Sequence, residues 1–538
     1  MKNFATIANR SDLIRTVLYF VVVIATSFLF RDLLVNLSLG FLLFFVILLP
    51  HAFRYQKKNS SLSDYFLLDR SLPTTGFASS LLATNLSLGN YLIVVFILGY
   101  FFGINGIIIS IIGIFANYLG ASFLIPKIKP FITDSVINIG TINNFIGMSH
   151  NSFLLRKYCA SITIFSLFLA IVFELHILTI IIANIFKLSP TFIFPCLVLI
   201  ICIYASIGGF AAVVFTDLVQ AAMNIVVVFT LLLFFYYFFD PSYELILSKL
   251  DSESMPWTIW VSVPTLSLFW FISSLDQWQR TSASGDISVS LKGTFWGLLG
   301  MAFIGIGFVV LGIVDNQAFL PFLNNQGISL LDNQGISLLD FFMINEIVGI
   351  SNLGFVVLVL WGLALIFAAL STADTFMIAI SHSIVGDYIL GSRNIHYWKS
   401  KEKGNPYVKM AQGCVVFLGI FVIIIWFILD HFMLIRDPLN FFFVAYSGQF
   451  ALTGSVIFAA LKLKLNANVS IVSVTVGVLL SYGLGGFALW SYLGGIEPFI
   501  VLKSEEIVSL TPVFTIFGSV MTYLCGYLLK FRTPLQGD

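Results

Sequence analysis

A run of oxygen-bearing side chains interrupts one of the most apolar stretches of the chain. Spacings of three and four residues place Ala368, Ser371, Thr372 and Thr375 on one face of a helix, with Asp374 adjoining them. This face offers hydroxyl groups, a carboxylate and backbone carbonyls, and hard cations prefer oxygen ligands. The pattern therefore predicts a cation site. It is also compatible with a packing face on which Ser and Thr bond to carbonyls one turn earlier.

Other ionisable residues lie inside apolar stretches. Glu174 and His176 are two residues apart in LAIVFELHILTI, and Asp217 lies near the start of its segment in FTDLVQ. Such groups are costly in lipid and mark functional sites by default. Two alternatives stay open: a polar cluster of Glu174 and His176 that satisfies itself, and a helix-capping role for Asp217 at the membrane interface.

A third feature is the segment Ser79–Asn90, with the sequence SSLLATNLSLGN. Small and amide side chains with Gly89 make this a poor continuous helix inside an otherwise apolar span. Transporters build ion and solute sites from discontinuous helices of this kind, where backbone carbonyls are freed. The segment therefore predicts a broken helix near the middle of the membrane.

The composition shows which elements must position these residues. Of 538 residues, 59% are hydrophobic and only 10% are charged, whereas a soluble domain carries about 25% charged residues. Continuous apolar runs of about 20 residues predict membrane helices rather than barrel strands. A net charge of +1 gives no case for nucleic-acid binding, and the five cysteines form no close pair typical of a metal or redox motif. The scattered histidines and the absence of an HExxH motif or a phosphate loop argue against an enzyme, and no catalytic residue is predicted.

Apolar length and loop charge together predict about fourteen membrane helices with both termini on the same side. The first apolar run is followed by no cleavage site, so a first helix is favoured over a signal peptide. The expected spans are 13–30, 33–53, 75–101, 103–125, 158–186, 190–207, 211–239, 257–276, 293–314, 352–385, 410–433, 439–461, 468–490 and 511–529.

The positive-inside rule assigns an orientation to these spans. Most Lys and Arg residues fall in loops on one side, which we predict to be cytoplasmic. The exceptions on the other side are Arg31, Lys187, Lys249, Arg436 and Lys503. We therefore expect a multi-pass protein of the cell inner (plasma) membrane with both termini in the cytoplasm. One external loop holds a tandem repeat, in which Asn325–Asp332 (NQGISLLD) recurs as Asn333–Asp340; we expect it to be a neutral duplication.

Five stretches resemble the sodium/solute symporter family, which includes bacterial sodium/proline, sodium/sialic acid and sodium/glucose carriers. They are Asp64–Pro73 (DYFLLDRSLP), Ala83–Asn90 at the expected break, Tyr204–Gln220 (YASIGGFAAVVFTDLVQ), Asp276–Arg280 (DQWQR) and Phe367–Tyr388, which ends in a D-x-Y signature. They follow the family order over roughly residues 64–390. Beyond these stretches the chain matches the family by hydropathy only.

The resemblance implies an all-α polytopic fold with a core of two inverted five-helix repeats that contain discontinuous helices. Two N-terminal helices and a linker would occupy 1–74, the first repeat 75–239, the second repeat 240–465, and two C-terminal helices with a short tail 466–538.

The resemblance also implies a sodium site between the first and eighth core helices. Its ligands would be the carbonyls of Ala83, Leu86 and Ala368 and the hydroxyls of Ser371 and Thr372. A possible second cation site would comprise Asp217, Ser371, Asp374 and Thr375. Because two neighbouring carboxylates in a low dielectric cannot both stay ionised without a cation, we expect a second sodium or a shared proton there.

For the solute, the sequence offers the polar residues Asn85, Ser87, Asn90, Glu174 and His176. Sialic acid carriers of the family hold a carboxylate with an Arg on the third core helix, where this chain has Glu174. An acidic group favours an amine, so we expect an amino acid or amine, with sodium as the coupling ion and no cofactor or obligate protein partner. A proton-coupled carrier of the same fold and a non-transporting sensor or channel remain the alternatives.

Overall fold

The computed structural model describes residues 10–134, 140–239, 255–314, 352–390, 398, 400, 405–432, 435, 438–463, 466–496 and 502–532. Among them, eleven helices are long and apolar enough to cross a membrane, or twelve if one bent pair counts as a single span. The chain is therefore a multi-pass helical membrane protein, as its composition predicts. The tandem repeat at 325–340 lies outside the described residues.

The spanning segments follow the expected apolar runs closely. They are α2 (Leu33–Lys58), α6 (Ile104–Asp134), α8 (Phe153–Phe186), α9 (Pro190–Gly208), α10 (Phe210–Phe239), α14 (Ile287–Val314), α17 (Asn352–Ser383), α19 (Pro406–His431), α20 (Pro438–Phe450) with α21 (Thr453–Ala460), α22 (Ala467–Val478) with α23 (Gly486–Leu493), and α24 (Ser504–Arg532).

The expected number of fourteen spans is not confirmed, and the difference lies in three places. The predicted span 13–30 is α1 (Arg10–Leu29), whose apolar part is shorter than the other spans. The predicted span 75–101 is broken into α4 (Thr74–Asn85), a π-helical turn (Leu88–Leu92) and α5 (Ile93–Phe102). The span predicted at 257–276 is bent by 48° between α12 (Trp257–Ser273) and α13 (Leu275–Ala283).

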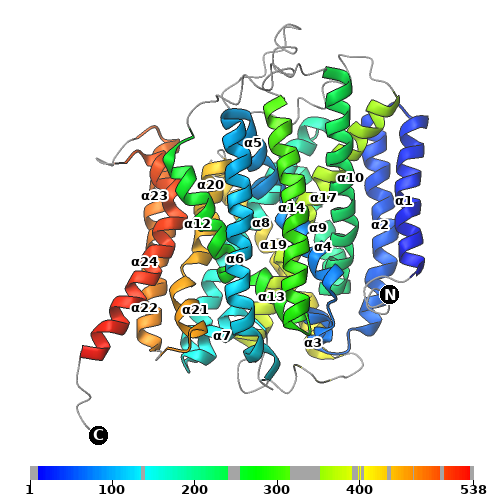
Figure 1. Ribbon diagram of the computed structural model, residues 1–538. Coiled ribbons are helices and arrows are strands. Elements are labelled where there is room, and N and C mark those ends of the chain that lie inside the picture. The colour runs from blue at the N-terminus through cyan, green and yellow to red at the C-terminus, as the bar shows by residue number, and fades with distance from the viewer. Residues whose placement is uncertain are drawn as a thin grey trace.

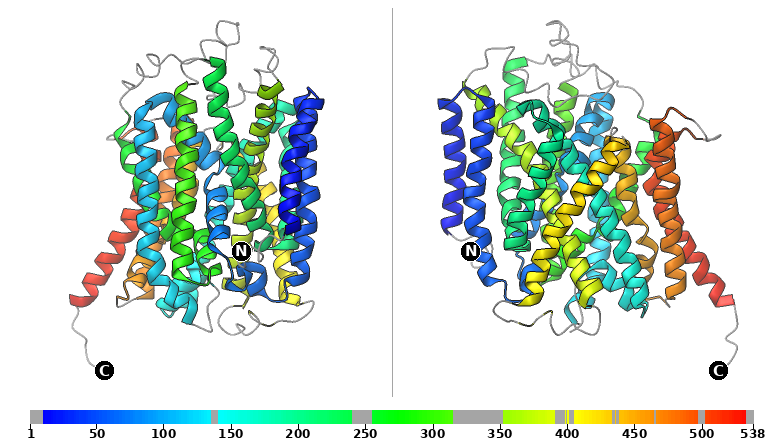
Figure 2. Two further views of the ribbon diagram at one scale, coloured as in Figure 1. Left: turned by 45° about the vertical axis from the view of Figure 1, so that its right-hand side comes forward. Right: turned by 180° about the vertical axis from the view of Figure 1, so that it is seen from behind.

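The helices form one bundle, in which the N-terminal and the C-terminal helices lie at opposite edges (Figure 1). Helices α1 and α2 lie at one edge and α22–α24 at the other, an arrangement that all views share (Figure 2). Helices α8 and α17 lie between them and are buried along most of their length. The first residues of α1 and the last residues of α24 lie toward the same side of the bundle, together with the short helices α3 (Leu62–Leu67) and α7 (Ile142–Ser149).

Glycines allow the helices around the broken segment to approach closely. A Cβ atom at Gly99 in α5 would lie 2.0 Å from the carbonyl oxygen of Val309 in α14. A Cβ atom at Gly312 in α14 would lie 2.2 Å from the carbonyl oxygen of Phe96. Small residues at helix interfaces are how membrane helices gain van der Waals contact, since apolar surface alone gives little preference over lipid. Helix α5 is thus held against α14 along its length.

Candidate ion and solute site

Several of the stretches that carry the family resemblance contact one another. The capping box of Ser61 and Asp64 starts α3, and the hydroxyl of Tyr65 donates to the carbonyl oxygen of Ser206 at 3.0 Å. The side chain of Gln279 in α13 donates to the carbonyl oxygen of Phe66 at 2.9 Å. Three of the five stretches that carry the family resemblance are therefore in direct contact.

The break in the α4–α5 segment brings backbone carbonyls next to α17. Helix α4 ends at Asn85, so its last carbonyls lack intrahelical partners. The hydroxyl of Thr372 donates to the carbonyl oxygen of Thr84 at 3.0 Å and to that of Ala368 at 3.2 Å. Ala83 lies in the last turn of α4, and Leu86 is the first residue beyond it. The structure thus places the five residues of the expected sodium site at one junction.

The candidate second site is a buried network of hydroxyls and carboxyl groups. Ser371 donates to Oδ1 of Asp217 at 2.5 Å, and Ser80 donates to Oδ2 of the same carboxylate at 2.6 Å. Asp374 accepts from Tyr204 at 2.5 Å and from Thr216 at 3.3 Å.

Further oxygens complete this network. The hydroxyl oxygens of Thr375 and Thr84 lie 3.1 Å apart. Oδ1 of Asp374 has no hydrogen-bond partner among the described residues. The four residues of the expected second site are therefore close together and fully buried, on α10 and α17.

A buried arginine adjoins this network, a role the sequence did not predict for it. Arg280 forms an ion pair with Asp276 at 2.6 Å, one turn earlier in α13. Its Nε donates to Ser80 at 2.9 Å, and its Nη2 donates to Thr84. The guanidinium thus links the bent segment α12–α13 to the broken segment and, through Ser80, to Asp217. The spacing of four residues between Asp276 and Arg280 was the available signal for this pair.

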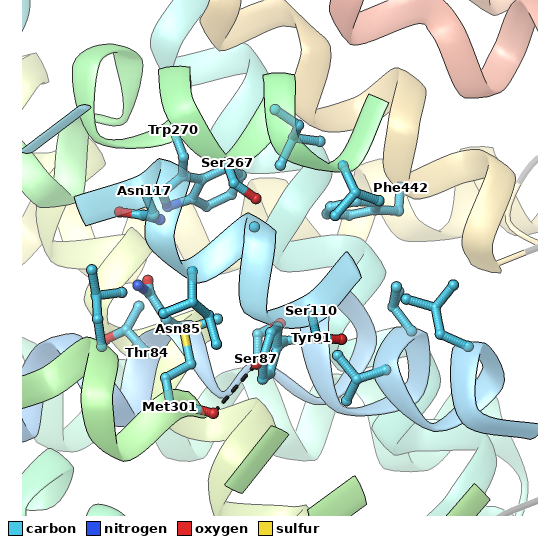
Figure 3. Close-up of a pocket in the computed structure, with 18 of the residues that line it drawn as sticks. Thr84, Asn85, Ser87, Tyr91, Ser110, Asn117, Ser267, Trp270, Met301 and Phe442 are labelled. Atoms are coloured by element: carbon cyan, nitrogen blue, oxygen red, sulfur yellow. Dashed lines mark hydrogen bonds between the residues drawn. The ribbon is translucent and has the colours of Figure 1, made fainter. Parts of the chain in front are cut away.

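A cavity of about 110 Å³ lies beside the broken helix (Figure 3). Its wall includes polar side chains of the broken segment, Thr84, Asn85 and Ser87, and polar side chains of facing helices, Asn117 and Ser267. Aromatic rings form much of the remainder, from Tyr91, Trp270, Phe376, Phe442 and Phe443. Among the described residues, none that lines this cavity is charged.

The predicted solute residues separate into two groups. Asn85 and Ser87 line the cavity, and Asn85 also accepts from the side chain of Gln277 at 3.1 Å. Glu174 and His176 are not among the lining residues: Glu174 bonds to Ser87 and Gly89, whereas His176 accepts from Trp426 at 3.1 Å. The two do not form a cluster with each other. The side chain of Asn90 lies outside the described part of the structure.

The cavity contains residues that sequence reasoning missed. Trp270 and Asn117 come from apolar runs without any local pattern, and they reach the wall only through the packing of α6 against α12. The D-x-Y signature was recognised, but its partner was not: Asp387 forms a buried ion pair with Arg156 of α8 at 2.8 Å. No sequence spacing relates these two residues, which are far apart in the chain.

A family model and one solved structure agree with this architecture. The sodium:solute symporter family model matches residues 65–256. The solved structure of a Na⁺-coupled sialic acid symporter, in a substrate-bound outward-open state, is similar over 96% of this chain and 98% of its own, with a TM-score of 0.65 and 15% identity. A manganese transporter from Eremococcus coleocola covers 86% of this chain and 95% of its own, with a TM-score of 0.45 and 14% identity.

No curated protein sequence matches the chain. At 15% identity, the likeness to the solved symporter concerns the fold. The resemblance to the sodium:solute symporter family is therefore confirmed, by the family model over residues 65–256 and by a shared fold along nearly the whole chain.

Proposed function

We propose that this chain is a sodium-coupled symporter that carries a small organic solute, an amino acid or an amine, into the cell by alternating access. The observation that supports this most is the junction of the broken helix with α17. There the hydroxyl of Thr372 donates to the carbonyl oxygen of Thr84, a residue that also lines the cavity, and the hydroxyl of Ser371 donates to Asp217. An oxygen-rich junction next to a solute-sized cavity suits a cation and a solute that bind together.

In this proposal, external sodium is held by Ala83, Leu86, Ala368, Ser371 and Thr372. Because these ligands belong to the broken α4–α5 segment and to α17, bound sodium fixes the two together and stabilises the form that accepts solute. Solute then binds beside Asn85 and Ser87, and the bundle rocks to open inward. Because ligand coupling is reciprocal, bound solute also raises the affinity for sodium.

The driving force of one sodium ion is sufficient for accumulation. The membrane potential contributes about 2.3 kcal/mol per charge per 100 mV. Since about 1.4 kcal/mol corresponds to a factor of ten, one sodium at a potential of about 100 mV supports a roughly 40-fold accumulation of a neutral solute. A chemical gradient of sodium adds to this ratio.

The second candidate function is proton-coupled transport on the same fold. It is favoured by the buried carboxyl groups of Asp217, Asp374 and Glu174. Uptake into proteoliposomes separates the two candidates, with an imposed sodium gradient at constant pH in one arm and an acid external pH without sodium in the other. We expect uptake only in the first arm. Uptake driven by the proton gradient alone contradicts the sodium assignment.

A further inference from the structure

The break in the α4–α5 segment creates donors as well as acceptors. Where the helix restarts, its first N–H groups have no intrahelical partners, and in a membrane each needs an acceptor. In transporters with discontinuous helices, such a half-helix N-terminus points at the anionic group of the substrate. The group that occupies this position therefore indicates whether the solute has an anionic group to place there.

In this chain a carboxylate of the protein itself occupies the position. The two carboxylate oxygens of Glu174, on α8, accept from the backbone N–H of Gly89 at 3.2 and 3.1 Å. One of them also accepts from the hydroxyl of Ser87 at 2.7 Å. Glu174 is fully buried, and among the described residues no basic side chain forms an ion pair with it.

The broken segment packs closely against α8 at Gly89. A Cβ atom at Gly89 would lie 2.6 Å from Ile177, 2.7 Å from Phe173 and 3.0 Å from Oε2 of Glu174. Only a glycine lets this N–H reach the carboxylate. A carboxylate of the solute would have to displace Glu174 from this N–H group.

The cavity on the other side of Ser87 is suited to a cation. Ser87 lines the cavity and donates to Glu174, so one hydroxyl group separates the buried carboxylate from the solute space. Rings of Trp270, Phe376 and Phe442 form part of the wall, and aromatic faces attract alkylated ammonium groups. The positive charge of Arg280, which touches the wall at Thr84, is matched by Asp276 at 2.6 Å.

We propose that the solute is a small alkylated ammonium ion that carries no carboxylate. This inference rests on the proposed transport function and narrows its substrate class. The ammonium group lies among the aromatic rings, and Glu174 supplies the negative charge through Ser87.

The test uses two solutes that differ in one group. Choline and glycine betaine share the trimethylammonium head and differ in a hydroxymethyl group against a carboxylate. The purified full-length protein is melted in sodium and in potassium with each solute, and with alanine and tetramethylammonium. We expect choline to raise the melting temperature in sodium at a concentration at least about tenfold below that of betaine, a ratio that corresponds to about 1.4 kcal/mol.

Two variants assign the preference to Glu174. Glu174→Gln keeps an oxygen acceptor for Gly89 but removes the charge, so the preference for choline over betaine should shrink about tenfold. The control is Glu505→Gln, which removes the same charge at an exposed position in the first turn of α24 and should leave the preference unchanged.

The outcomes separate this inference from the proposed function. Tighter binding of betaine or alanine than of choline overturns the inference, as does binding of none of the four solutes while sodium itself still raises the melting temperature. An unchanged preference in Glu174→Gln also overturns it. A protein that responds to neither sodium nor solute refutes the sodium-coupled function on which the inference rests.

Discussion

The two interrupted helices of this protein satisfy their backbone in different ways. The α4–α5 segment is capped from outside, because Glu174 of α8 accepts from Ser87 and Gly89. The α12–α13 segment is capped largely from within: Ser274 contacts Asp276, the indole of Trp278 donates to Ile272 at 2.9 Å, and Asp276 pairs with Arg280. The first break therefore depends on where another helix lies, whereas the second carries most of its own partners.

We expect this difference to give the two interrupted helices different roles, one in ligand binding and the other in the stability of the fold. A break that is capped by a neighbouring helix changes its geometry when that helix moves, which suits a segment that reports solute binding. A bend whose charges are paired one turn apart keeps its shape as the bundle moves. We therefore expect changes at the first break to alter mainly binding and changes at the second to alter mainly folding.

The largest effect is expected at Asp276 and Arg280. Asp276→Asn leaves a fully buried guanidinium without its carboxylate, and breaking a buried ion pair in this way costs about 3–5 kcal/mol. We expect a large drop in melting temperature and in the yield of monodisperse protein. The double variant Asp276→Asn with Arg280→Gln leaves no unpaired charge and should recover part of the loss. Equal stability of the single variant and the wild type would contradict the self-contained capping of the bend.

A smaller effect is expected for the same chemical change at the other break. Glu174→Gln replaces the hydrogen bonds from Ser87 and Gly89 to a carboxylate with bonds to a neutral amide. Among the described residues, the change leaves no buried basic side chain without its partner. We expect a loss of about 1 kcal/mol, the usual difference between charged and neutral hydrogen bonds. The melting temperatures of Glu174→Gln, Asp276→Asn and the wild type are measured in potassium without solute and compared. A loss as large as that of Asp276→Asn would remove the distinction between the two breaks.

The smallest effect is expected at a histidine that lies outside the membrane-spanning segments and away from both interrupted helices. His150 is buried after α7, where its ring nitrogens lie 2.9 Å from the carbonyl oxygen of Ile146 and 2.7 Å from the hydroxyl of Tyr523. Burial lowers the pKa of His150 below its ordinary value of 6.5. The unfolded chain therefore binds a proton at this histidine more readily than the folded protein does. The contribution of His150 to the stability of the fold is complete above pH 6.5 and declines as the pH falls below that value.

The check is the change in melting temperature between about pH 7.5 and about pH 5.5, a window that spans the ordinary histidine pKa. We expect His150→Gln to lose less stability across this window than the wild type. An equal loss in both proteins would show that His150 does not titrate in the folded state as described.

Much of the fold could be predicted from the sequence, because hydropathy and length depend on local composition. The break at residues 85–88 was visible in the small and amide residues of Ser79–Asn90. The face of Ser371 and Thr372 followed from helical spacing. These features are set within one segment, so a single sequence reveals them.

Contacts between distant segments could not be predicted in this way. The sequence indicated that Glu174 would be buried, but its partner at Gly89 depends on how α8 packs against the broken helix. Trp270 and Asn117 were not singled out, because their place in the cavity wall arises from packing alone. Arg280 stood in a recognised stretch, yet its contacts with Ser80 and Thr84 required the fold.

The most direct test of the account is sodium binding at the junction of α4 and α17. The melting temperature is measured in sodium against potassium at constant ionic strength, for the wild type and for Ser371→Ala with Thr372→Ala. We expect sodium to stabilise the wild type specifically, and the double variant to need at least about tenfold more sodium for the same shift, a loss of about 1.4 kcal/mol. An equal sodium dependence in both proteins, or no sodium effect in the wild type, would contradict the account.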